Sequence, residues 1–453
     1  MDAESPASGS ATATLEGRAL ALLAVLCVAY FLDAVDVSMI NVTLPAIQHA
    51  VRLSTATLQW VVSGYVLGFG GFLLVGGRAA DLFGRRRVFL VPLGVFVLAS
   101  VVGGLADSGT LLIVSRFVKG VAASFTAPAG LSIITTSFPE GSVRNRALAA
   151  YTATGAAGFT FGLIGGGVLT AVSWRLVFFM PAALAALALA AGTRLVPSDG
   201  PRDAARGRLD LPGAISVTGA MLLLVYTLTE APSKGWGSGR TLVSLLLVAI
   251  LLIAFVLIEQ RQRTPLVPLR LLSPARLRAY FSGMAFVGGW AAAQFIATLY
   301  LQDTRGWSAL HTAAAFWPCG ILGLLVAPWL ERLIERLGLQ VVLAIGVAMS
   351  VATYALMRPI GLGTHYWTGL FPAFALIGIA FGLAYSTVNI AATNGVAGHE
   401  QGIASGLLQT AIQFGTALIL AIATAVRLAS SGHAAGANST LHGYHAALLV
   451  PLA

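Results

Sequence analysis

Charged side chains are scarce in this sequence. Only 10% of its 453 residues are charged, whereas 57% are hydrophobic and the mean hydropathy is +0.85. A soluble globular protein carries about 25% charged residues, so these few charges cannot cover a surface that faces water. Most of the surface is therefore expected to face lipid, which excludes an ordinary soluble protein.

Patterns for metal, redox and nucleotide chemistry are also lacking. The two cysteines, Cys27 and Cys319, lie in apolar runs without a CxxC or His-rich neighbourhood, which argues against a metal or redox site. No GxxxxGK[ST], HExxH or GxSxG motif occurs, so neither ATP-driven transport nor an enzyme is indicated. We expect no metal and no cofactor; the proton is expected only as a coupling ion.

The net charge of +10 reports membrane orientation and does not indicate a nucleic-acid partner. Nucleic-acid binding needs basic residues gathered on one face, but here they fall in short loops between apolar runs. The loops on one side hold seventeen basic residues and those on the other side seven. By the positive-inside rule the N-terminus is predicted to be cytoplasmic. The predominance of Arg over Lys, with abundant Ala and Gly, suggests a GC-rich bacterium.

The apolar runs predict membrane-spanning helices, each of which needs roughly 20 residues. Thirteen runs begin near Leu20, Leu58, Val88, Leu111, Leu148, Leu176, Leu211, Leu242, Tyr280, Thr312, Val341, Trp367 and Ile403. A fourteenth begins at Tyr444 but ends after ten residues, so we expect an incomplete last helix, as in a truncated chain. Residues 1–18 lack the basic region of a signal peptide and are predicted to form a disordered cytoplasmic tail.

An internal repeat divides these runs. The stretch GRAADLFG at 77–84 returns in outline as ERLIERLG at 331–338, an offset of 254 residues. Six helices of about 20 residues with their loops use roughly 180 residues, and the remainder matches two extra helices. The predicted division is an N-terminal six-helix bundle at 19–196, linkers with two inserted helices at 197–277, and a C-terminal bundle at 278–453.

The loop GGRAADLFGRRRVFL, residues 76–90, is the first specific motif. Its glycines permit a tight turn, and Asp81 can cap a helix or pair with an arginine. Three arginines alone would fit any cytoplasmic loop, but the full spacing resembles the signature loop of the major facilitator superfamily, which acts there as a latch between two halves. The resemblance assigns Gly77, Arg78, Asp81, Gly84, Arg85, Arg86 and Arg87 to this latch, and Arg332, Glu335 and Gly338 to its second-half counterpart.

The segment VDVSMINVTLPAIQ resembles the first helix of the fourteen-helix drug:proton antiporter branch of that family. Asp36 and Asn41 take the positions of the motif's Asp and Asn, and Asp33 is additional. RFVKG at 116–120 is similar to the branch's fourth-helix motif, with Lys119 in place of the usual Gln. The resemblance covers nearly the whole chain. It implies an all-helical, monomeric membrane protein with two pseudo-symmetric six-helix bundles and two inserted central helices.

A glycine-rich stretch, GAAGFTFGLIGGG at 155–167, resembles the antiporter motif of the fifth helix. It keeps Gly158, Gly162, Gly166 and Gly167 but has Leu163 where that motif usually has Pro. Small residues at this spacing also pack helices together without any transport role. Both interpretations stay open from the sequence.

Two acids and two bases are the strongest candidates for function. Asp33 and Asp36 lie one helical turn apart, as do Arg116 and Lys119. An ionised acid at the centre of a membrane helix costs about 2.5–3.5 kcal/mol, so the acids and bases are expected to neutralise each other across a cavity and remain titratable. We expect Asp36 to be the principal carboxylate, modulated by Arg116. Asp33 either takes a direct part or is solvated nearer the cytoplasmic end.

Four uncharged polar residues, Asn41, Tyr65, Gln294 and Gln413, complete the candidate site as cavity or interhelical contacts. The resemblance implies proton-driven efflux of small hydrophobic or amphipathic compounds, such as antibiotics, by alternating access around a site near the membrane midplane. The alternative in the same class is a transporter of one metabolite: an amino acid, a siderophore or a self-made antibiotic. A non-transporting sensor or scaffold would call for an added soluble domain or a degenerate latch, and neither occurs.

Overall fold

The structure is a computed structural model that describes residues 17–139, 142–198, 210–262, 267, 271–396, 401–430 and 437–452. All regular elements in these ranges are helices. The predicted tail at 1–18 lies almost entirely outside the described residues.

The chain forms three consecutive groups of helices. The first is α1 (Gly17–Val51), α2 (Thr55–Phe83), α3 (Arg85–Leu105), α4 (Gly109–Ser137), α5 (Ser142–Val172) and α6 (Leu176–Leu195). The second is α7 (Leu211–Lys234) and α8 (Gly239–Arg261). The third is α9 (Pro274–Leu299), η2 (Tyr300–Thr304), α10 (Ala309–Ala315), α11 (Trp317–Leu337), α12 (Leu339–Met357), η3 (Tyr366–Leu370), α13 (Phe371–Thr393), α14 (Gln401–Ser430), α15 (Ala437–Ala447) and η5 (Val450–Leu452).

Every predicted apolar run lies in a helix. Eleven helical segments among the described residues are long and apolar enough to cross a bilayer, and shorter apolar stretches lie in α5 and α7. One predicted run is divided, because α10 ends just before Pro318, whose ring and missing N–H break a continuing helix. The all-helical membrane architecture predicted from the sequence is confirmed.

Serine caps fix where several helices begin. Ser54, Ser108, Ser238 and Ser273 each accept a hydrogen bond from the backbone N–H three residues on. This bond satisfies one of the N–H groups that the first helical turn leaves without a partner. The cap at Ser273 starts α9 at Pro274, so the predicted boundary at residue 278 falls inside this helix.

The repeat found in the sequence is also present in the backbone. Gly84 separates α2 from α3 with φ 94° and ψ 136°, and Gly338 separates α11 from α12 with φ 85° and ψ 150°. Positive φ is accessible to glycine without the steric cost that a Cβ imposes. The two glycines lie 254 residues apart, so corresponding places in the two halves use the same turn.

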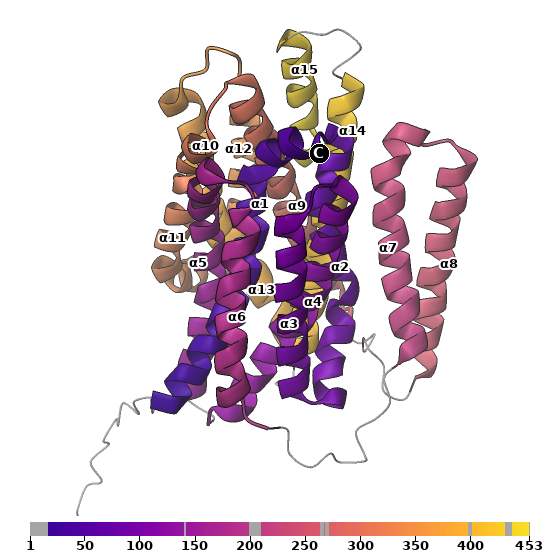
Figure 1. The fold of residues 1–453 in the computed structure, drawn as a ribbon, viewed down its shortest axis with the longest axis vertical. Helices are drawn as coiled ribbons and strands as arrows, with labels where there is room; N and C mark the ends of the chain where they lie inside the picture. Colours follow the sequence, from indigo (N-terminus) through magenta and orange to yellow (C-terminus); the bar gives the residue numbers. More distant parts are fainter. Residues whose placement is uncertain are drawn as a thin grey trace, which may run out of the picture.

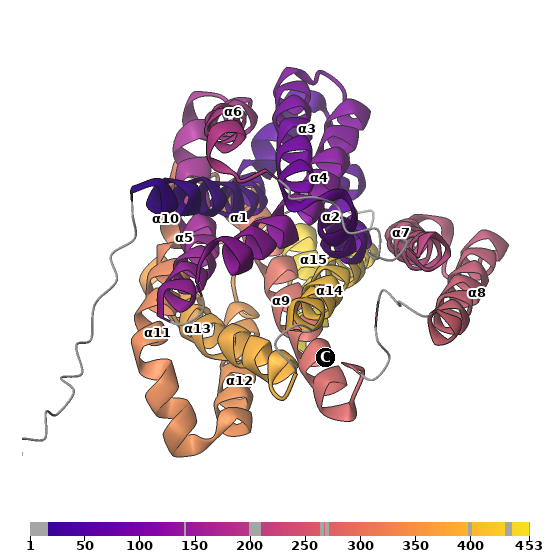
Figure 2. The same cartoon turned by 90° about the horizontal axis from the view of Figure 1, so that it is seen from below.

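The inserted helices lie to one side of the other helices (Figure 1), and the view from below agrees (Figure 2). α7 contacts α2 and α14, and α8 packs on α7. Much of the remaining surface of α8 is exposed and apolar, including Leu242, Leu246, Ile250 and Ile253. In a membrane this face contacts lipid.

Helices α1 and α5 run parallel and approach closely through small residues. Three α5 glycines lie against α1 at intervals of four residues, and a hydrogen bond between two threonine hydroxyls (2.8 Å) continues the series one turn further. The pairs are Gly158 with Phe31, Gly162 with Val35, Gly166 with Met39, and Thr170 with Thr43. Residues four apart share a helix face, so these glycines form a packing surface for α1.

We predict that Gly162→Ala destabilises the protein and that Gly165→Ala does not. A Cβ on Gly162 would lie 2.8 Å from the Val35 carbonyl oxygen and would also collide with the Ser38 hydroxyl, whereas a Cβ on Gly165 would meet only the flexible end of Met39. Overpacking of this kind costs about 1–3 kcal/mol. Thermal unfolding of the purified protein in detergent measures the effect. Equal melting temperatures for the two variants would contradict the α1–α5 packing described here.

Candidate functional site

Asp36 lies at the centre of a buried ion pair. One of its carboxylate oxygens accepts a hydrogen bond from Nη1 of Arg116, and the other accepts one from Nζ of Lys119. All three side chains are at most 3% exposed. Arg116 and Lys119 reach the same carboxylate because they are one turn apart on α4. Nε of Arg116 also donates to the backbone carbonyl of Val61 on α2, at 2.9 Å.

Aromatic rings enclose the two cations. The Arg116 guanidinium lies 4.7 Å from the ring centre of Tyr65, and the Lys119 ammonium lies 4.7 Å from that of Phe96 and 5.2 Å from that of Phe178. A cation over an aromatic face is attracted by the electron-rich ring. Since these rings come from α2, α3 and α6, the charges lie inside the first group of helices.

Asp33 is buried as well, near the middle of the 35-residue helix α1. Its side chain is only 9% exposed, and Oδ2 has no hydrogen-bond partner among the described residues. Of the two alternatives that the sequence left open for Asp33, this burial favours a place inside the bundle over full solvation. The cause is the length of α1, which begins at Gly17 and places Asp33 well inside the bundle. Tyr65 also has a buried hydroxyl without a partner among these residues.

Asn41 and Gln294 connect α1 to α9. Nδ2 of Asn41 lies 3.5 Å from Oε1 of Gln294, a long hydrogen bond, and also donates to the Val37 carbonyl at 3.1 Å. A second bond between the same two groups of helices runs from Nε2 of Gln302 to the Val42 carbonyl, at 2.8 Å. Both contacts lie toward the end of the bundle where α1 ends, here named the Val51 end; the opposite end is the Gly17 end.

Helices α5 and α10 also meet closely toward the Val51 end. A Cβ on Gly167 would lie 3.0 Å from the carbonyl oxygen of Ala309, 3.1 Å from Cα of Leu310 and even closer to Ala313. Gly320 on α11 similarly faces Thr160 on α5. The first and third groups of helices are therefore in tight contact at this end. Of the four motif glycines, three pack against α1 and Gly167 packs against the other group.

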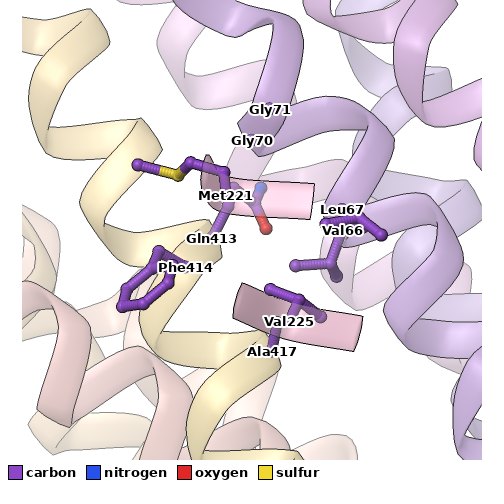
Figure 3. Close-up of a pocket in the computed structure, with 9 residues that line it drawn as sticks. All are labelled: Val66, Leu67, Gly70, Gly71, Met221, Val225, Gln413, Phe414 and Ala417. Carbon is purple, nitrogen blue, oxygen red and sulfur yellow. The ribbon is translucent and has the colours of Figure 1, made fainter. Parts of the chain in front are cut away.

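Gln413 lines a small apolar pocket between α2, α7 and α14 (Figure 3). The pocket residues are Val66, Leu67, Gly70, Gly71, Met221, Val225, Gln413, Phe414 and Ala417. Its volume, about 10 Å³, is close to the minimum that holds one water molecule, and drug-sized ligands need about 300–1,000 Å³. Gln413 thus contributes to the junction of α2 with α14 and lies apart from the residues that hold Asp36.

The predicted latch loop is fastened to the end of α6. Arg86 donates from Nη1 to the Val196 carbonyl, at 2.8 Å, and from Nη2 to that of Thr193. Gly84 supplies the turn described above, and Gly77 has space around its Cα. Arg78 and Arg85 are half-buried and Arg87 is exposed, while the Asp81 side chain lies outside the described part of the structure.

The side chains of the second-half counterpart are more exposed to solvent. Arg332 is exposed and lies 5.5 Å from the ring centre of Trp329, and Glu335 is exposed too. Gly338 repeats the turn of Gly84. The structure therefore reproduces the backbone of the repeat, while the side-chain contacts of the two loops differ.

Three contributors to the site escaped the sequence reasoning. Phe96 and Phe178 lie in apolar runs where one aromatic residue looks like any other, so no local signal marks them as neighbours of Lys119. Gln302 was identifiable in principle, because it is a polar residue at the end of an apolar run. Its role as a bridge to α1 depends on the packing of distant segments.

We predict that Asp36→Asn strongly destabilises the protein, whereas Asp107→Asn changes stability little. Loss of the Asp36 charge leaves two buried cations facing each other, and breaking a buried ion pair costs about 3–5 kcal/mol. Asp107 also pairs with an arginine, Arg175 at 2.6 Å, but its side chain is 87% exposed and water screens the charge. Melting temperatures in detergent compare the two. A stable Asp36→Asn protein would show that the cations have other acceptors.

Comparisons of the sequence with known proteins identify a family. The family model for the Major Facilitator Superfamily matches residues 26–420. The puromycin resistance protein of Streptomyces alboniger is 38% identical over 443 residues, covering 94% of this chain and 87% of that protein. The cephamycin export protein of Amycolatopsis lactamdurans is 36% identical over 427 residues, covering 92% and 86%.

A solved structure supports the fold independently. The crystal structure of a POT family transporter in complex with 5-aminolevulinic acid matches with a TM-score of 0.68, over 95% of this chain and 94% of that one, at 16% identity. The predicted arrangement of two six-helix bundles with two inserted helices is confirmed, and the transporter family excludes an enzyme. Since the family model spans most of the sequence and relatives more than 30% identical cover nearly all of it, this chain belongs to the Major Facilitator Superfamily.

Proposed function

We propose that this protein exports small hydrophobic or amphipathic compounds, antibiotics among them, across the cytoplasmic membrane of a GC-rich bacterium. The observation that carries the proposal is the match, over more than nine-tenths of the chain, to one relative named for puromycin resistance and another named for cephamycin export. The protein acts as a monomer in the bilayer without nucleic acid. The excess of arginines in one set of loops supports a cytoplasmic N-terminus and, with it, a cytoplasmic Gly17 end.

Transport proceeds by alternating access, with protons as the energy source. Contacts at the Val51 end, through Asn41, Gln302 and Gly167, close the outer side in this conformation. Rocking of one half against the other opens it. Buried ionisable residues in membrane helices mark proton and substrate pathways by default. One proton gains about 2.3 kcal/mol per 100 mV, which sustains roughly a 40-fold concentration gradient.

Inverted membrane vesicles from a host stripped of its own pumps test the proposal. We expect a fluorescent efflux dye and puromycin to accumulate when the lumen is acidified, and to leave when an uncoupler dissipates the proton gradient. Vesicles without the protein are the control. Transport of many compounds in the panel supports multidrug export, whereas transport of a single compound supports the single-metabolite alternative. If no compound in the panel accumulates under a pH gradient, proton-driven drug export is the wrong assignment.

Closing the outer contact covalently provides a test of alternating access. In a Cys27→Ser, Cys319→Ser background we expect the pair Asn41→Cys and Gln294→Cys to cross-link through a short thiol reagent and to stop dye export. A reducible cross-linker lets a reductant restore export. Each single cysteine variant, treated identically, is the matched control. Unchanged export by the cross-linked protein would mean that α1 and α9 stay together throughout the cycle.

A further inference from the structure

The two acids of α1 differ in their partners although they are one turn apart. Asp36 holds both available cations, one on each oxygen. Asp33 is nine-tenths buried, and its Oδ2 has no hydrogen-bond partner among the described residues. An ionised carboxylate with a buried oxygen that accepts no hydrogen bond is more costly than the neutral acid. The geometry therefore distinguishes a paired, ionised Asp36 from an Asp33 that is best accommodated with its proton.

The ionisable groups that interact electrostatically with Asp33 come from several helices. Its own helix contributes Tyr30 and Asp36, α2 contributes Tyr65, α4 contributes Lys119, and α5 contributes Tyr151. Tyr30 and Tyr151 stack with their ring centres 4.6 Å apart. The Tyr65 hydroxyl is buried and has no hydrogen-bond partner among the described residues, so its O–H is not committed to another acceptor there.

The two cations differ in freedom. Arg116 is fixed at three points: the Asp36 carboxylate, the Val61 carbonyl and the Tyr65 ring. Lys119 donates to Asp36 through its ammonium group, its other contacts are the ring faces of Phe96 and Phe178, and it acts electrostatically on Asp33 as well. An ammonium on a four-carbon stem can be redirected by small helix movements, whereas a planar guanidinium held at several points cannot.

We propose that Asp33 is the residue that carries the transported proton, and that Lys119 is a cation shared by the two acids. This rests on the proton-driven export proposed above. In the present conformation Lys119 belongs to Asp36, and Asp33 is protonated. When the halves rock, the Lys119 ammonium turns to Asp33. The O–H bond of Asp33 breaks, its proton passes to water, and the carboxylate gains Lys119 and the Tyr65 hydroxyl as partners. Asp36 keeps Arg116 throughout.

Infrared difference spectroscopy of the full protein in lipid nanodiscs tests the protonation directly. We expect wild type at neutral pH to show the C=O stretch of a buried carboxylic acid. Asp33→Asn should abolish this band and Asp33→Glu should shift it. The control is Asp303→Asn, which removes an acid from the third group of helices and should leave the band unchanged. Persistence of the band in Asp33→Asn, or its absence from wild type, would overturn the proposal.

Transport separates this inference from the proposed function. We expect Asp33→Asn to bind dye and let it move down its gradient at close to the wild-type rate, but to lose accumulation driven by a pH gradient. Lys119→Gln should lose accumulation too, and Asp33→Glu should retain part of it. If wild type accumulates dye and Asp33→Asn matches it, the inference fails while export stands. If wild type itself shows no pH-driven accumulation, export fails, and the infrared band still decides whether Asp33 holds a proton.

Discussion

Neutralisation of charge within an apolar bundle is the constraint on which the arrangement depends. Arg116 and Lys119 cannot be left without an anion in the membrane interior, and Asp36 satisfies both. That requirement fixes α1 against α4, and the bond from Arg116 to Val61 adds α2. Helix α1 also contacts two further helices: one of its faces packs against the glycines of α5, and Asn41 hydrogen-bonds to Gln294 of α9.

Much of this architecture could be predicted from the sequence, because the signals are local. The length of an apolar run determines whether a helix spans, and the recurrence of Gly84 as Gly338 marks equivalent turns. Helical spacing predicts that the two acids can meet the two bases, and the family resemblance singles out Asp36 and Arg116. Spacing cannot predict which acid receives Lys119, because Asp33 and Asp36 fit the pattern equally. Phe96 of α3 and Phe178 of α6, which lie beside Lys119, are tertiary neighbours that no local pattern marks.

The glycine motif of α5 is a second case in which the sequence does not tell which helix each residue contacts. Neighbouring residues on a helix point about 100° apart, so Gly166 faces α1 while Gly167 faces α10. The sequence presents them as one run of identical residues. The packing and transport interpretations of the motif are therefore compatible: one glycine face holds the first group of helices together, and the next residue sets the contact with the third group.

The contacts within the first group of helices are stronger than the contacts between the groups at the Val51 end, as rocking of one half against the other requires. Within the first group, an ion pair buried among aromatic rings and a backbone approach repeated over successive turns resist deformation. Between the groups, the side-chain contacts at the Val51 end are a hydrogen bond of 3.5 Å, one glutamine bound to a carbonyl, and small residues in van der Waals contact. Uncharged contacts of this kind separate at a much lower cost than a buried ion pair. Because the Asp36–Arg116 ion pair lies wholly within the first group, the halves can separate at the Val51 end without breaking it.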